Sequence, residues 1–186
     1  MGRRKKKKAF VPEAYDMREM DVVLTASRFP ITWESIKRNA TAGWRNTFNN
    51  DVSTHAGFIV KVNGKWMIAE LKYPSGKIVP FEKYITRRKL KPRIVAVKRF
   101  AEYNDEKLRR IANKRTCQDC VKFEYDIPGL FEFYNICKDK PHKYYCSEFV
   151  RYESAIDKVK WRQKFYDKIG PYSIELEGNS KMMWHE

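Results

Sequence analysis

Apolar residues in this chain gather into short blocks, and most of these blocks are typical of β-strands. The clearest pattern covers residues 56–71, where two apolar runs flank the dipeptide Asn63-Gly64. An Asn-Gly pair between two such runs predicts a β-hairpin with a two-residue turn. Shorter apolar blocks at Asp21–Thr25 and Arg93–Arg99 predict two further strands.

The predicted turn also fixes which residues of the hairpin face each other. If Val62 lies opposite Lys65, the residues of one hairpin face are all apolar. The other face then carries His55 and Glu70, with Glu70 opposite Gly57 and diagonal to His55. Glycine has no side chain in the way, so we expect the Glu70 carboxylate to reach and orient the His55 imidazole. The predicted apolar pairs are Ala56 with Leu71, Phe58 with Ala69 and Val60 with Met67.

Helical patterns lie mainly in the second half of the chain. Asn104 is a candidate N-cap for a helix that runs to about Lys114, and a second helix is expected from Cys146 to about Ala155. The other expected features are a weak helix at Trp33–Asn39, a turn at Tyr73–Lys77, a mixed connection at Lys77–Tyr84, irregular structure at 116–143 and a helix at Lys158–Lys168. The pattern therefore predicts an α+β protein with an antiparallel sheet packed against helices.

Length and composition favour a single domain preceded by a charged arm. The chain has 186 residues, of which 42% are hydrophobic, enough for a sizeable core. Residues 1–12 contain an unbroken basic run from Arg3 to Lys8, which repels itself and predicts a flexible basic arm. We place one domain at residues 13–186.

Net charge points to anionic partners without choosing among them. Lys and Arg number 39 against 23 Asp and Glu, a formal charge of +16. Such a field favours nucleic acid, anionic polymers, acidic peptides or lipid headgroups. The basic arm is either a solvated tail or a tether to such a polyanion. The many aromatic residues would suit stacking on nucleic-acid bases, but those in apolar patterns, such as Phe58 and Phe149, favour a core.

Nothing in the sequence predicts a membrane span or an exported protein. No apolar run reaches the roughly 18 residues of a spanning helix, and the basic start leads into a mixed segment, Ala9–Glu13, where a signal peptide would have its apolar core. We expect a protein that is cytoplasmic as synthesised. Its four cysteines are too few for a disulfide scaffold, so reduced thiols are expected.

Reduced thiols allow nucleophilic chemistry, and Cys146 is the candidate. A cysteine in the first turn of a helix meets the positive end of the helix dipole and unpaired N–H groups, which favour the thiolate. His55 would serve as its base and Glu70 would fix the imidazole tautomer. The backbone N–H of Cys146 and the phenol of Tyr125 are candidate oxyanion donors.

A zinc site is the alternative use of the cysteines. The spacing of Cys117 and Cys120 suits two thiolates on one tetrahedral ion, and Cys137 and His142 would complete the set. The second half of this pattern is a loose fit, so packing or surface thiols are the competing interpretation. We expect no cofactor.

The candidate residues and their order resemble a known family. Asp21–Thr25, then Thr54–Gly57 with Glu70 on the next strand, then Tyr145–Val150, are similar to segments of the permuted papain-like amidases of the YiiX and YaeF type. The lysine-rich Gly76–Tyr84 and the segment Phe123–Asp126 extend the resemblance over most of residues 20–152. Met20 departs from it, because a glycine often precedes the Asp in the family.

The resemblance implies a circularly permuted relative of NlpC-type cell-wall peptidases, with Cys146 as nucleophile at a helix N-terminus, His55 as base and Glu70 as orienting group. Peptide or amide bonds of peptidoglycan-like or acylated substrates would be its targets. The lecithin-retinol acyltransferase-like proteins share the order of His before Cys, so hydrolysis or transfer of lipid acyl groups is an alternative. A third is a non-catalytic subunit on the same scaffold, packaged in a phage particle or bound to a polyanion.

Overall fold

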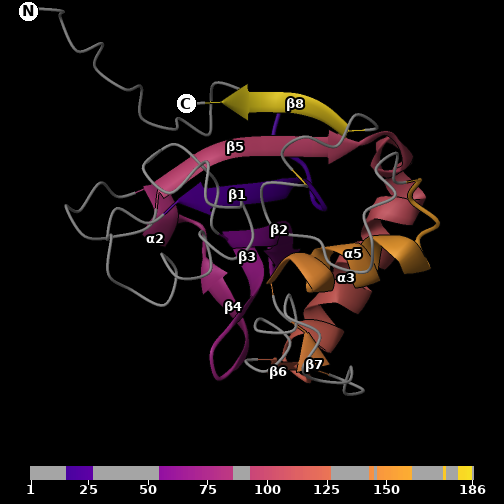
Figure 1. Cartoon of the computed structure of the whole chain (residues 1–186). Helices are drawn as coiled ribbons and strands as arrows, with labels where there is room; N and C mark the ends of the chain where they lie inside the picture. Colours follow the sequence, from indigo (N-terminus) through magenta and orange to yellow (C-terminus); the bar gives the residue numbers. More distant parts are fainter. Residues whose placement is uncertain are drawn as a thin grey trace, which may run out of the picture.

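Eight strands form one sheet with helices packed beside it (Figure 1). The computed structural model describes residues 16–26, 55–85, 93–126, 143–144, 146–160, 174 and 180–185. The predicted arm at 1–12 and the predicted helix at Trp33–Asn39 lie outside these residues, as does most of the helix predicted at Lys158–Lys168. Within the described residues the architecture is α+β, as the sequence predicts.

The sheet order is β7-β6-β4-β3-β2-β1-β5-β8, and every pairing is antiparallel except that of β6 with β7. The strands are β1 (Val22–Ala26), β2 (His55–Val62), β3 (Lys65–Lys72), β4 (Ser75–Pro80), β5 (Arg93–Phe100), β6 (Glu124–Tyr125), β7 (Lys143–Tyr144) and β8 (Ser180–His185). The helical elements are α2 (Glu82–Ile85), the 3-10 helix η3 (Ala101–Asn104), α3 (Glu106–Cys120) and α5 (Cys146–Ile156).

The predicted hairpin is confirmed with its register. Val62 pairs with Lys65, Val60 with Met67 and Phe58 with Ala69. Asn63 and Gly64 both have positive φ angles, 49° and 77°, the backbone that a two-residue turn between twisted strands requires. The strands predicted at Asp21–Thr25 and Arg93–Arg99 are also present, as β1 and β5.

Alternate residues of the central strands supply two separate cores, one on each face of the sheet. On β2, Phe58 and Val60 belong to the larger cluster, whereas Ile59 belongs to the smaller one. Helices α3 and α5 lie on the side of the larger cluster (Figure 1). There the ring of Phe149 on α5 packs edge to face against that of Phe58, with 6.0 Å between the ring centroids. The smaller cluster includes Tyr84 of α2.

The predicted helix cap at Asn104 is wrong by one residue. Asn104 ends η3, and Asp105 is the N-cap of α3, where its carboxylate accepts a hydrogen bond from the Leu108 N–H at 3.0 Å. The helix continues beyond the expected end at Lys114 to Cys120. Cys117 and Cys120 therefore lie on a helix, within the stretch predicted to be irregular.

Removal of this cap should lower the stability of the protein modestly but measurably. Asp105→Ala deletes the acceptor for the Leu108 N–H, and we expect a loss of about 1 kcal/mol in the free energy of unfolding. Chemical denaturation of the two proteins measures it. Asp105→Asn keeps a capping oxygen and should recover most of the loss; equal destabilisation by both variants would contradict the assignment of the cap.

The turn predicted at Tyr73–Lys77 is also wrong in extent. Only Tyr73 and Pro74 form the turn, and β4 begins at Ser75 and pairs with β3 along its whole length. Gly76 lies inside the strand, and the end of α3 passes directly over it. A Cβ at this position would lie 1.7 Å from the carbonyl oxygen of Cys120, so only glycine fits.

Buried polar contacts hold the far end of α5 against α3. Arg115 of α3 binds both carboxylate oxygens of Asp157, just beyond α5, at 2.8 Å each, and reaches Glu153 of α5 at 3.2 Å. Thr116 donates to Glu153 at 2.9 Å and the Tyr103 hydroxyl donates to Asp157 at 2.8 Å. These five residues, the α3–α5 cluster, tie two helices and η3 together.

A second buried ion pair joins the start of β1 to the end of β5. Asp21 is fully buried and accepts two bonds from the Arg99 guanidinium, at 2.7 and 2.8 Å. The Arg18 N–H adds a third bond at 3.0 Å. Burial nevertheless raises the pKa of Asp21, in spite of the hydrogen bonds from Arg99 and Arg18.

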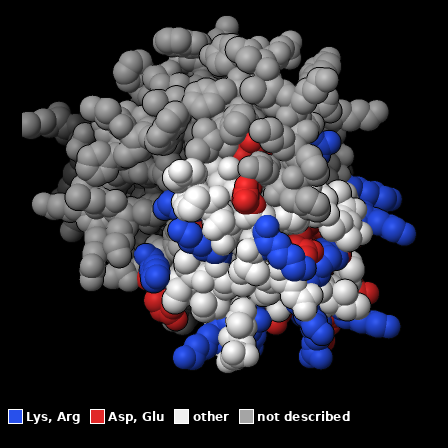
Figure 2. Space-filling view, turned by 90° about the horizontal axis from the view of Figure 1, so that it is seen from below, with Lys and Arg blue, Asp and Glu red and all other residues white. Residues whose placement is uncertain are grey.

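Charges of both signs mix on the described surface. In Figure 2, Lys and Arg side chains surround the described face, and Asp and Glu lie between them. The predicted contact of the basic arm with nucleic acid or another polyanion stays a prediction. In the described part of the chain, α-helices are too short or too polar for a transmembrane span.

Candidate active site

His55 and Glu70 meet at the position that the hairpin register predicts. His55 is the first residue of β2, and its Nε2 lies 2.6 Å from Glu70 Oε2 on β3. Gly57 makes room between them, since a Cβ there would lie 2.8 Å from the Ala69 carbonyl oxygen and 3.3 Å from Glu70 Cβ. Both side chains are buried, so water competes little for this hydrogen bond.

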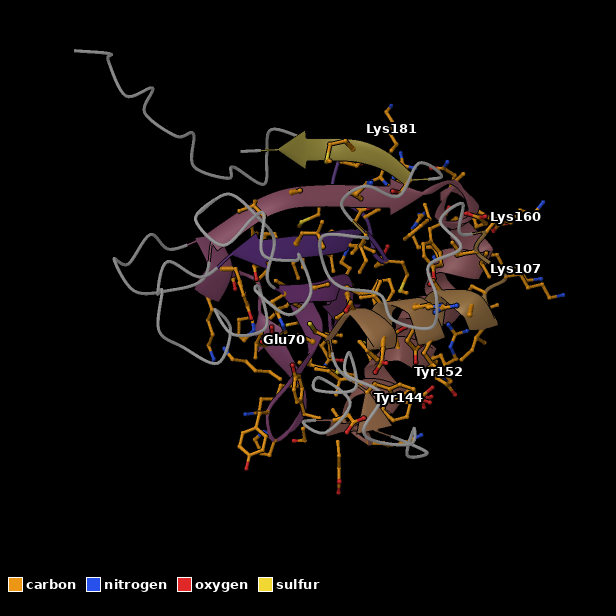
Figure 3. The ribbon with its side chains drawn as sticks, viewed as in Figure 1. Glu70, Lys107, Tyr144, Tyr152, Lys160 and Lys181 are labelled. Carbon is orange, nitrogen blue, oxygen red and sulfur yellow. The ribbon has the colours of Figure 1, made fainter. Side chains whose placement is uncertain are left out.

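The side chain of Cys146 contacts the same imidazole. It is the first residue of α5, and its side chain hydrogen-bonds to His55. Because Nε2 of His55 is engaged by Glu70, Nδ1 is the ring nitrogen that remains for the sulfur. In Figure 3 Glu70 lies inside the fold near the start of α5, while Lys107, Lys160 and Lys181 point outward.

The charges of these three groups stabilise one another. Burial opposes a charged imidazole, but the Cys146 sulfur and then the Glu70 carboxylate outweigh it and raise the pKa of His55 to about 10. For Glu70, burial is likewise outweighed, first by the hydrogen bond from His55, and its pKa is lowered. The arrangement thus favours the imidazolium form of His55, held between the Cys146 sulfur and the ionised Glu70 carboxylate.

Tyr84 is a site residue that the sequence reasoning missed. Its hydroxyl donates a short hydrogen bond to Glu70 Oε2, the same oxygen that contacts His55. The Phe81 N–H bonds to the Trp66 carbonyl, and the Tyr84 N–H bonds to the Phe81 carbonyl, which fixes α2 against β3. The available signal was weak: a tyrosine among apolar residues needs a partner for its hydroxyl when buried.

Tyr125, the predicted second oxyanion donor, is buried on β6. Its backbone N–H bonds to the Pro74 carbonyl at 3.0 Å, and it pairs with Tyr144, two residues before Cys146. Tyr125 belongs to the larger core cluster. Its position next to β7 brings it to the segment that leads into α5, and its role as an oxyanion donor stays a prediction.

Cys120 is a buried thiol and Cys117 a partly buried one, and both favour the protonated form. Burial raises the pKa of Cys117 to about 11 and that of Cys120 to about 12. Cys120 Sγ lies 3.6 Å from the carbonyl oxygens of Glu70 and Lys77, where an S–H can donate. The other two residues of the zinc prediction, Cys137 and His142, lie outside the described residues, so that prediction stays untested.

Comparison with known proteins gives a structural likeness. No protein-family model and no curated protein matches the sequence. Among solved structures, the chain is similar to the crystal structure of metalloprotein YiiX from Escherichia coli O157:H7. The TM-score is 0.61 at 16% sequence identity, and the match covers 91% of this chain and 97% of that one.

The name metalloprotein belongs to YiiX, and the described residues of this chain do not fit a metal ion. No group of three or more His, Cys, Asp or Glu side chains among them could hold one. Within the described residues, Glu70 and Cys146 both contact the His55 imidazole. At this level of identity the likeness concerns the fold alone: the chain shares the α+β fold of YiiX.

Proposed function

We propose that this protein is a cysteine hydrolase that cleaves amide bonds through Cys146, His55 and Glu70. The observation that carries the proposal is the buried contact series in which one imidazole hydrogen-bonds to a sulfur and to a carboxylate. Nucleophile, base and orienting group are the three roles that thiol catalysis needs, and Cys146, His55 and Glu70 are the residues we assign to them, in that order. The fold shared with YiiX and the sequence resemblance to its family support the same assignment.

In the proposed reaction the Cys146 thiolate attacks the acyl carbon and forms a carbon–sulfur bond. The His55 imidazolium then gives its proton to the amide nitrogen as the carbon–nitrogen bond breaks, and an amine leaves. Water attacks the resulting thioester while His55 takes a proton from it; the carbon–sulfur bond then breaks, which releases the carboxylic acid and restores the Cys146 thiolate beside the His55 imidazolium. Glu70 remains ionised throughout and stabilises the imidazolium. The backbone N–H of Cys146 is the proposed donor to the oxyanion.

We further propose that the domain is a permuted papain-like one, with the histidine strand before the cysteine helix. In β2 and α5 this order places the base on the sheet and the nucleophile on the first helical turn, where backbone N–H groups point toward the substrate. Peptidoglycan-like or acylated amides are the proposed substrates. Esters and lipid acyl groups stay open, since a thiolate attacks both kinds of carbonyl.

The pH dependence of alkylation tests the proposal without a known substrate. Iodoacetamide reacts with thiolates, and we expect Cys146 to react well below the ordinary thiol pKa of about 8.5. The sign follows from His55: its pKa of about 10 keeps the imidazolium, and with it the thiolate, through neutral pH. Mass spectrometry of the Cys146 peptide at a series of pH values gives the reaction rate.

Cys117 is a control within the same molecule. It is a partly buried thiol whose pKa is raised to about 11, so its alkylation should become appreciable only in alkaline solution. A Cys146 rate that rises with a midpoint at or above that of a free cysteine would overturn the proposed mechanism and leave the structural, non-catalytic role as the better account.

A further inference from the structure

Tyr84 and Glu70 form a second contact behind the candidate nucleophile and base. Oε2 of Glu70 accepts hydrogen bonds from both His55 Nε2 and the Tyr84 hydroxyl. The tyrosine comes from α2, outside the segments that hold the other three residues. Its ring packs in the smaller core cluster with Phe81 and Ile68, so the hydroxyl is held in place by the core of the sheet.

A second donor on one carboxylate oxygen matters because the last torsion of a glutamate side chain is soft. This torsion joins an sp³ to an sp² carbon and has a broad, nearly two-fold preference. With His55 as its only partner, the carboxylate would rotate readily and exchange its oxygens. Two donors on the same oxygen restrict that rotation.

From this geometry we propose that Tyr84 is a positioning residue, which fixes the Glu70 carboxylate so that Glu70 in turn holds the His55 imidazolium beside Cys146. The proposal rests on the proposed function and adds a fourth member to its site. Tyr84 contacts Glu70 and acts through it. The Tyr84 hydroxyl also stabilises the ionised carboxylate, because a hydrogen bond to the charged form favours that form.

The charged and titratable groups around Glu70 determine in which direction loss of the Tyr84 hydroxyl would change the protonation of Glu70. His55 faces it from β2, Lys72 lies on its own strand, Lys77 pairs with it from β4, and the Cys120 thiol bonds to its backbone carbonyl. His55, then Tyr84 and Lys72, act to keep Glu70 ionised. Without the Tyr84 hydroxyl, the carboxylate would take up a proton at a higher pH, and the imidazolium would lose its counter-charge there.

The test compares Tyr84→Phe with Tyr103→Phe by alkylation of Cys146 across pH. Tyr103 is a matched control: it is also buried, and its hydroxyl donates to the carboxylate of Asp157 in the α3–α5 cluster. We expect Tyr84→Phe to shift the acid edge of the profile to higher pH and to slow alkylation at pH 6 about tenfold, the lower end of the weight of one hydrogen bond to a charged group. The Tyr103→Phe profile should coincide with that of the parent.

A second variant, which strengthens the hydrogen bond from position 84, keeps the proposal testable even if Tyr84→Phe does not fold. Site-specific 3-fluorotyrosine at position 84 keeps the ring and makes the phenol a stronger donor, so the acid edge should move to lower pH. A Tyr84→Phe profile that coincides with the parent, or a fluorotyrosine edge that does not move, would overturn the role of Tyr84. A parent profile like that of a free cysteine would instead overturn the proposed function itself.

Discussion

Cys146→Ala is expected to abolish amide hydrolysis while leaving the fold intact. Loss of the nucleophile removes the covalent route altogether, and the rate should fall on the order of 10⁴-fold or more. The sulfur is a small part of the packing around a buried first helical residue, so the thermal midpoint should change little. Turnover of acyl amides, acyl esters and purified peptidoglycan fragments by the two proteins measures the effect and selects the substrate class.

Two further variants make this result specific. Cys117→Ala makes the same chemical change on a partly buried thiol of α3 and should keep full turnover. His55→Ala in the Cys146→Ala background should cost nothing more, because residues that act as one unit lose their effect together. Turnover that survives Cys146→Ala would place any hydrolysis elsewhere in the molecule.

Gly76→Ala is expected to have the largest effect on stability. The added Cβ would lie 1.7 Å from the carbonyl oxygen and 2.7 Å from the carbonyl carbon of Cys120. Both are backbone atoms at the end of α3 and cannot rotate away. We expect a loss of at least about 4 kcal/mol, at the extreme of single substitutions, which corresponds to a fall of about 10 °C or more in the thermal midpoint.

Gly64→Ala is the comparison for this variant. Gly64 has a φ of 77° and no atom within 4 Å of an added Cβ, so only backbone strain of about 1 kcal/mol is expected. Thermal denaturation followed by circular dichroism should therefore separate the two glycines clearly. Similar midpoints for both variants would mean that the sheet and α3 separate at little cost.

The candidate site was predictable where local rules determine it. Asn63-Gly64 fixes the hairpin turn, the turn fixes the register, and the register places Glu70 beside His55. That sequence of steps uses only neighbouring residues and the two-residue period of strands. The start of α5 at Cys146 likewise follows a local change of pattern.

The remaining features depend on contacts between distant segments. Gly76 has the sequence signature of a turn, but its glycine is required by the approach of α3, which no local pattern reveals. Tyr84 lies on a helix of four residues, too short for a periodic signal. Strand β8 comes from a short run at the end of the chain and is defined by its pairing with β5. In each case tertiary packing decides the outcome.

Whether a related protein keeps the proposed activity should therefore depend on more than the residues around the Cys146 sulfur. Helix α5 begins with Cys146. About 16 Å along its axis, Arg115 of the α3–α5 cluster binds Asp157 just beyond the other end of the helix. This contact holds α5 against α3 at the end away from Cys146, and loss of Arg115 would leave the buried Glu153 and Asp157 carboxylates without their cationic partner. A relative that keeps Cys146, His55 and Glu70 but loses Arg115 would carry the three proposed site residues on a destabilised fold.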